Sequence, residues 1–236
     1  MLEIDSEILQ KVRDIKNTFL EITVFPNQNN WIEKTNNELW LNVVAQVMVV
    51  GNSKPHQKFL ARLDLQRKIS YESLLELDSN DEVLRSINFV LLAVGTRWAS
   101  RILSKSVKAK SLLHNFNKFK KYDKGVIGFL EEITNISSDK QKINHLMSEI
   151  KYIKTKGARD FLMELGIVEN AIAFDVRVQN VLQKIGINLP KKFTANPTLY
   201  SKIENEILEK ICMPLSISGV MFDRMIYQNY NQILSK

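Results

Sequence analysis

Cysteine is almost absent from this sequence, since Cys212 is the only one among 236 residues. A single thiol cannot form an internal disulfide, a four-cysteine zinc site or an iron–sulfur cluster. The three histidines, His56, His114 and His145, stand far apart and lack the spacing of metal ligands. The sequence therefore predicts no metal site, and we expect no cofactor.

Glycine and proline are also scarce, with 8 and 5 residues respectively. So few breaks favour long helices over the many turns of a β structure. No segment alternates polar and apolar residues convincingly, as a half-buried strand would. Because hydrophobic residues make up 44% of the chain, a disordered tail is excluded. These features predict an all-α fold with a sizeable core.

Long apolar runs are missing as well. No run reaches the roughly 18–20 residues that a membrane span needs. The N-terminus is acidic and amphipathic, which does not fit a signal peptide. The net charge of +7 and the sequence pI of about 9.3 favour a polyanionic partner, which charge alone leaves open between DNA, RNA and an anionic membrane.

Capping residues and apolar spacing outline the helices. Thr35 and Glu38 have the spacing of a capping box, and Gly51 stands where a helix C-cap glycine would. Little polar surface lies between them, so this helix should be buried. Gly166 and Gly186 end two further helices, and the mostly apolar connector between these should pack against the core. Other helices are expected at about 5–22, 55–66, 70–77, 81–94, 105–124, 140–150, 200–212 and 219–234. After the helix at 81–94, residues 95–98 interrupt the pattern before a further helix that ends near residue 103.

The stretch 105–124 is rich in lysine, with apolar residues interleaved at helical spacing. It predicts an amphipathic helix with a cationic face. That face is either an ordinary solvated surface or a strip that binds phosphates. The lysines are Lys105, Lys108, Lys110, Lys118, Lys120, Lys121 and Lys124.

Lys156 and Asp175 stand at the starts of two successive helices, so both can point to a common cleft. The positive end of a helix dipole and the like charges of Lys151, Lys154 and Arg159 should lower the pKa of Lys156. A neutral amine is what nucleophilic catalysis by lysine requires. The ordinary alternatives are a solvated surface lysine and a purely structural N-cap aspartate.

Residues 150–182 resemble the signature of the helix–hairpin–helix DNA base-excision glycosylases, and most closely the 8-oxoguanine DNA glycosylase branch. In that branch a small residue follows the catalytic lysine at +2, and an aspartate comes nineteen residues after the lysine. Here Ala158 follows Lys156 at +2, and Asp175 is nineteen residues on, since 175 − 156 = 19. Arg177 stands where the family usually has a histidine that faces the DNA backbone, and a cation there would keep the phosphate-binding role.

Weaker similarity extends beyond this core. Asn52 and Ser53 would lie in the family's polar loop near the gap left by the extruded base. The stretch 94–113 resembles a segment of the archaeal-type enzymes with a Gly-x-Arg-aromatic core. Tyr227 and then Phe222, in the last helix, are candidates for stacking on the base; ordinary core aromatics are the alternative.

One departure concerns the hairpin. The family carries two glycines just before the lysine, where this chain has Tyr152 and Lys154. Because other residues resist positive φ, we expect a different backbone shape here. Lys151 or Lys154 would replace amide contacts to DNA with charge. The substrate base should therefore not be inherited from the family.

The resemblance implies a single domain over residues 1–236 with a cleft between two helical lobes. One lobe covers about 55–150, and the N-terminal and C-terminal helices form the other. The partner would be duplex DNA with a modified base, without a membrane or metal-cluster partner, and we expect a monomer. We expect a cytoplasmic protein, associated with the nucleoid if the source is bacterial or archaeal.

The implied activity is excision of a damaged base, with 8-oxoguanine as the first candidate. A Schiff base on Lys156 would then give AP lyase activity. Two alternatives remain: a monofunctional glycosylase in which Asp175 activates water, and an inactive DNA-binding module.

Overall fold

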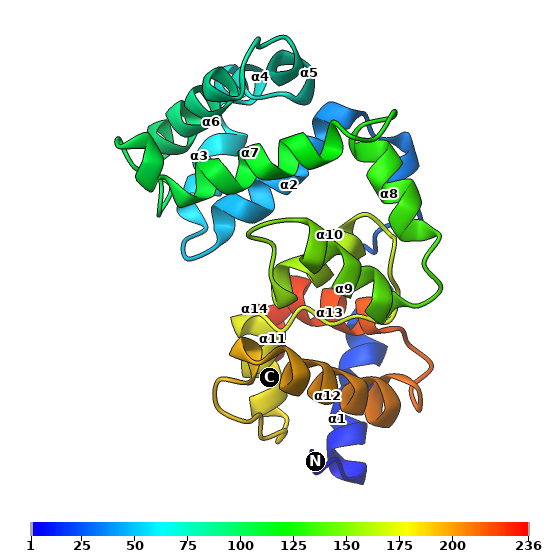
Figure 1. Cartoon of the computed structure of the whole chain (residues 1–236). Coiled ribbons are helices and arrows are strands. Elements are labelled where there is room, and N and C mark those ends of the chain that lie inside the picture. Colours follow the sequence, from blue (N-terminus) through cyan, green and yellow to red (C-terminus); the bar gives the residue numbers. More distant parts are fainter. Residues whose placement is uncertain (1, 236) are drawn as a thin grey trace. The chain divides into compact units, whose positions relative to one another are not determined.

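The computed structural model describes residues 2–235, and over this range the regular structure is helical throughout, without a strand (Figure 1). The all-α prediction is confirmed. The chain divides into two compact units. The terminal unit runs up to Asn29 and continues from Thr155 onward, and the middle unit is Asn30–Lys154. The middle unit thus begins at Asn30 and not near residue 55. Among the described residues, no helix is both long and apolar enough to cross a bilayer.

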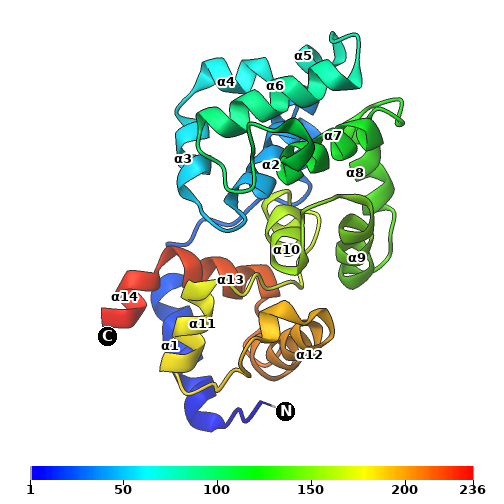
Figure 2. The ribbon, with the colours of Figure 1, turned by 60° about the vertical axis from the view of Figure 1, so that its left-hand side comes forward.

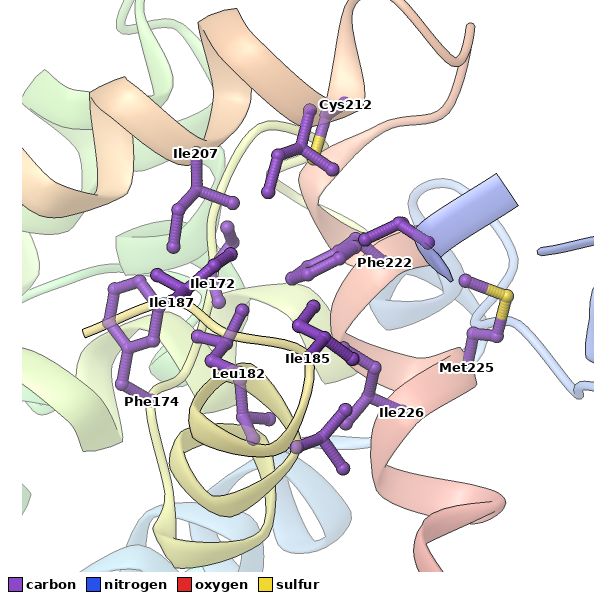
Figure 3. Close-up of a cluster of buried hydrophobic side chains, with 14 of the residues drawn as sticks. Ile172, Phe174, Leu182, Ile185, Ile187, Ile207, Cys212, Phe222, Met225 and Ile226 are labelled. Carbon is purple, nitrogen blue, oxygen red and sulfur yellow. The ribbon is translucent and has the colours of Figure 1, made fainter. Parts of the chain in front are cut away.

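The terminal unit is built from helices at both ends of the chain. Its core gathers apolar side chains of the connector before α11, of α11 itself, of the α12 region and of α13 (Figure 3). Helix α11 packs against α13 and α14 (Figure 2). The elements are α1 (Ser6–Phe19), α10 (Thr155–Glu164), α11 (Val176–Lys184), the 3₁₀ turn η3 (Phe193–Ala195), α12 (Pro197–Ile207), the π-helical turn η4 (Leu208–Cys212), α13 (Gly219–Gln228) and α14 (Tyr230–Ser235).

The middle unit has one buried helix at its centre, α2, which packs against α3, α5, α7 and α8. Trp40 of α2 is fully buried, and its indole donates a hydrogen bond of 2.8 Å to the Ile69 carbonyl. The elements are η1 (Asn30–Glu33), α2 (Asn36–Val49), α3 (Lys54–Leu60), α4 (Leu63–Lys68), α5 (Tyr71–Leu75), α6 (Asn80–Ala93), η2 (Leu103–Lys105), α7 (Val107–Phe119), α8 (Val126–Thr134) and α9 (Asp139–Glu149).

The predicted helix boundaries hold where they rest on caps. The capping box of Thr35 and Glu38 is present at the start of α2. Gly51, Gly166 and Gly186 all have the left-handed backbone expected after a helix, with φ of 85°, 65° and 105°. Gly166 is also sterically required, because a Cβ there would lie 2.1 Å from the Asn27 carbonyl oxygen.

Three predicted helices differ in the structure. The helix expected at about 55–66 is divided into α3 and α4. The helix expected to end near residue 103 is replaced by an irregular segment that leads to the short turn η2. The last helix is divided at Asn229 between α13 and α14. The Asn229 amide donates to Met225 O at 2.9 Å and to Thr23 Oγ1 at 3.0 Å, and such side-chain hydrogen bonds compete with helical ones.

Candidate active site

Lys156 lies in the first turn of α10, one residue after the helix begins. Its Nζ is 3.2 Å from Oδ2 of Asp160, and the Lys156 side chain is 41% exposed. Residues four apart on a helix lie on the same face, so the sequence spacing itself sets this pair. The amine is therefore accessible to a ligand, while its contact with the Asp160 carboxylate fixes its orientation.

Asp160 binds a second cation with its other oxygen. Oδ1 of Asp160 lies 3.2 Å from a terminal nitrogen of Arg224 on α13, whose side chain is mostly buried. The other terminal nitrogen of Arg224 lies 4.0 Å from Oδ1 of Asp223. These ion pairs connect the first turns of α10 to α13 within the terminal unit.

Asp223 is a buried carboxyl at the end of this chain of contacts. Its Oδ2 accepts a hydrogen bond of 2.8 Å from the Ala173 N–H. Burial raises the pKa of Asp223 to about 7, against the lowering effects of Arg224 and of the Ala173 hydrogen bond. The charges of Asp160 and Asp175 raise it further. Both of these carboxylates thus act electrostatically on the same buried acid.

Asp175 is the N-cap of α11, as its position in the sequence predicts. Its Oδ1 accepts a hydrogen bond of 2.9 Å from the Val178 N–H. The side chain is half-buried, at the positive end of the α11 dipole, where a carboxylate is stabilised. Capping occupies one oxygen and leaves a charged carboxylate on the surface of the terminal unit.

The connector that leads to Asp175 is buried and irregular, so its backbone groups need partners. The Tyr200 hydroxyl donates to Ile172 O at 2.8 Å and accepts from the Phe174 N–H at 2.9 Å. Glu204 accepts from the Ile172 N–H at 2.9 Å. Two side chains of α12 therefore fix the path of the segment that ends at Asp175.

Glu204 also binds Arg159, and this pair connects the connector to α10. The Arg159 guanidinium donates to both Glu204 oxygens at 2.7 and 2.5 Å and to Thr155 O at 2.9 Å. Both side chains are buried. The like charge that Arg159 was expected to add beside Lys156 is paired with the Glu204 carboxylate. Asp160 and Glu204 are the partners that sequence reasoning missed, although the i, i+4 spacing of Lys156 and Asp160 was legible.

Three solved structures share this fold. The chain aligns with the 8-oxoguanine DNA glycosylase of Methanocaldococcus jannaschii at a TM-score of 0.58 and 18% identity, over 94% of this chain and 90% of that one. It aligns with the 8-oxoguanine glycosylase/lyase of that organism, in complex with DNA containing 8-oxoguanine, at a TM-score of 0.60 and 16% identity. This alignment covers 96% of this chain and 98% of that one. With the 8-oxoguanine DNA glycosylase of Thermotoga maritima, the TM-score is 0.60 and the identity is 20%, over 93% of this chain and 92% of that one.

The chain has the fold of these 8-oxoguanine DNA glycosylases. The resemblance stated from residues 150–182 is thereby supported at the level of fold. No family model matches the sequence, and no curated protein is significantly similar to it.

The two aromatic candidates for stacking on a base lie in different surroundings. Phe222 is 0% exposed and packs inside the core of the terminal unit, so it presents no face to a ligand (Figure 3). This corrects its assignment to a base pocket; it is an ordinary core aromatic. Tyr227 is 37% exposed, and the guanidinium of Arg177 lies 4.5 Å from the centre of its ring. The two proposed DNA contacts, Tyr227 and Arg177, are therefore neighbours.

The hairpin between α9 and α10 corrects a second expectation. Tyr152 has a φ of 69°, so this non-glycine residue adopts the left-handed conformation that was expected to be avoided. The Asn115 side chain accepts from the Lys151 N–H at 2.7 Å and donates to Lys151 O at 3.0 Å. The Tyr152 ring packs edge-on against Trp98 at 6.2 Å. Side-chain contacts of the middle unit thus hold the turn, and Lys151 and Lys154 are exposed on it.

Asn52 and Ser53 lie on an exposed loop after α2, as predicted for a polar loop. The Asn52 side chain accepts a hydrogen bond of 3.0 Å from the Lys54 N–H. Gly51 packs against the Trp98 ring so closely that a Cβ would lie 2.8 Å from it. The loop is therefore positioned by an exposed aromatic of the same unit.

The lysine-rich stretch contains one residue that the amphipathic pattern misassigns. Lys108 is 0% exposed and points inward, where its Nζ donates to Met48 O at 3.0 Å and to Val50 O at 2.9 Å. Burial, and then the charge of Arg97, lower the pKa of Lys108 to about 8. Lys118 is paired with Glu149. The remaining lysines of the stretch are exposed, so the cationic face is narrower than predicted.

Proposed function

We propose that the protein is a DNA glycosylase with AP lyase activity whose nucleophile is Lys156. The observation that carries this proposal is an accessible lysine, 3.2 Å from Asp160, in a chain with the fold of 8-oxoguanine glycosylases. One of these neighbours is described as a glycosylase/lyase and is bound to DNA containing 8-oxoguanine. The net charge of +7 is consistent with a DNA partner.

The reaction would begin with a nucleotide extruded from the duplex, because a base inside the stack is out of reach. The Lys156 amine attacks C1′ of the deoxyribose and displaces the base. Asp175 offsets the positive charge that develops on the sugar. The resulting Schiff base allows β-elimination and strand cleavage.

Other residues would bind the duplex or the extruded base. Lys151, Lys154 and Arg177 are exposed cations suited to phosphate contacts. Asn52 and Ser53 would approach the gap in the stack. Tyr227 offers a partly exposed ring for the base. 8-Oxoguanine is the first candidate substrate, since it is the base that the neighbour's DNA contains.

A panel of duplexes, each with one modified base, tests the proposal with and without borohydride. Wild-type protein should release one base and form a borohydride-trapped adduct. Lys156→Gln should abolish the adduct. Lys11→Gln is the matched control, because Lys11 also pairs with a carboxylate four residues away and is 44% exposed, yet lies on α1. Adduct formation by Lys156→Gln would remove the nucleophile role, and binding without any product would favour a DNA-binding module.

The ion pair also supports a second function, a monofunctional glycosylase. An amine that stays paired with Asp160 as an ammonium is no nucleophile, and Asp175 would then activate water. Base release without strand scission or adduct would select this alternative.

A further inference from the structure

The Lys156–Asp160 pair suggests a further catalytic residue, and the inference rests on the proposed lyase function. The contact of 3.2 Å joins Asp160 Oδ2 directly to the nitrogen that would react. We propose that Asp160 takes the proton which this nitrogen must lose before the Schiff base can form.

The chemistry requires such an acceptor. Lys156 first releases its ammonium proton to water, so that Asp160 stays ionised. When the neutral amine then attacks C1′, the N–C1′ bond forms and the bond from C1′ to the base breaks, with its electron pair leaving on the base. The nitrogen then carries a positive charge and two hydrogens. Its transfer of one proton to Asp160 Oδ2 frees a lone pair. That pair forms the C1′–N double bond while the C1′–O4′ bond breaks, and O4′ takes up the proton from Asp160.

Arg224 gives Asp160 a fixed orientation for this role. It binds Oδ1 at 3.2 Å from α13, which leaves Oδ2 directed at Lys156. A carboxylate bound at Oδ1 by Arg224 and at Oδ2 by the Lys156 nitrogen cannot rotate freely, so the acceptor is in place before the reaction.

The neighbouring carboxyls are less suited to accept this proton. Asp175 uses Oδ1 to cap α11. Asp223 is 1% exposed and is bound to the Ala173 N–H. The charged groups near Asp160 include Lys156 on its own helix and Arg224 and Asp223 on α13. Asp175 acts on the same cluster through Asp223.

The test uses the full chain and a duplex with a preformed abasic site, on which adduct formation is measured directly. Asp160→Ala and the near-isosteric Asp160→Asn are compared with Asp81→Ala, which removes an exposed carboxylate paired with Arg85 at i, i+4. Borohydride trapping by both Asp160 variants should slow by about a hundredfold or more, the usual contribution of a positioned proton acceptor. Trapping by Asp81→Ala should match wild type.

Chemical rescue separates a proton acceptor from a structural residue. Formate should restore several-fold of the trapping rate in Asp160→Ala, while chloride at matched ionic strength should not. Thermal unfolding and the affinity for abasic DNA identify a variant that fails to fold, in which case Asp160→Asn carries the comparison.

The outcomes are distinct. Wild-type trapping rates in Asp160→Asn, or a slow Asp160→Ala without formate rescue, overturn this inference alone. A wild-type protein that forms no adduct with any duplex overturns the proposed lyase function, and this inference with it.

Discussion

Arg159 and Glu204, 45 residues apart in the sequence, form a bidentate ion pair in the interior of the terminal unit. Through Thr155 O and the Ile172 N–H, the same pair holds the start of α10 and the connector before α11. These are the two segments that carry Lys156 and Asp175. The pair therefore acts as a scaffold beneath the candidate site.

Removing the charge of Glu204 should be strongly destabilising. Glu204→Gln leaves a buried guanidinium without its counter-charge, and loss of one partner of a buried pair costs about 3–5 kcal/mol. Urea denaturation measures the change in the free energy of unfolding. Glu131→Gln is the control, because its pair with Lys124 is exposed and worth about 0–1 kcal/mol. Equal changes in the free energy of unfolding for the two variants would mean that the buried pair stabilises the fold no more than an exposed one.

Asp223 should make stability depend on pH. Burial raises its pKa from 3.8 to about 7, so between about pH 4 and pH 7 the folded state keeps a proton that the unfolded state has lost. The free energy of unfolding should therefore fall as the pH rises through this window. Asp223→Asn keeps an acceptor for the Ala173 N–H and should flatten that fall. Urea denaturation at several pH values checks this, and parallel profiles for the two proteins would contradict it.

Asp175 allows the cap and the chemistry to be separated. Asparagine caps helices about as well as aspartate, so Asp175→Asn should keep the fold and lose only the charge. Base release in single turnover should then slow by about a hundredfold, while the affinity for DNA changes little. Asp5→Asn, at the N-cap of α1, is the matched control. Equal losses of affinity and rate in Asp175→Asn would indicate a purely structural residue.

Gly166 and Gly95 test which left-handed glycines are sterically required. Alanine at either position adds about 1–2 kcal/mol of backbone strain, because both φ values are positive. At Gly166 a Cβ would also lie 2.1 Å from Asn27 O, whereas at Gly95 it meets nothing within 4 Å. Gly166→Ala should therefore lower the melting temperature much more than Gly95→Ala. Similar shifts would show that the Asn27 segment yields easily.

Local sequence signals predicted much of the helical outline. Capping residues such as Thr35 and Asp175 and stop glycines such as Gly166 act within one turn, so neighbouring residues suffice to place them. The break at Asn229 was not predictable in this way, because it depends in part on Thr23, 206 residues away.

The candidate site was predictable in part for the same reason. Lys156 and Asp175 were indicated by the resemblance to the glycosylase family, and the Asp160 pair follows the helical repeat. The partners of Arg159 and the interior position of Lys108 depend on which helices pack together, and periodicity alone cannot reveal that. Phe222 and Tyr227 look alike in the sequence, yet packing buries one and leaves the other partly exposed.

The turn at Tyr152 shows that residues distant in the sequence can stabilise a local backbone conformation. Its left-handed backbone depends on Asn115 and Trp98, which come from 37 and 54 positions earlier in the chain, since 152 − 115 = 37 and 152 − 98 = 54. A sequence search that requires glycines in this hairpin would therefore miss the protein. An asparagine and a tryptophan at the positions of Asn115 and Trp98 would be a better criterion for finding proteins with the same turn.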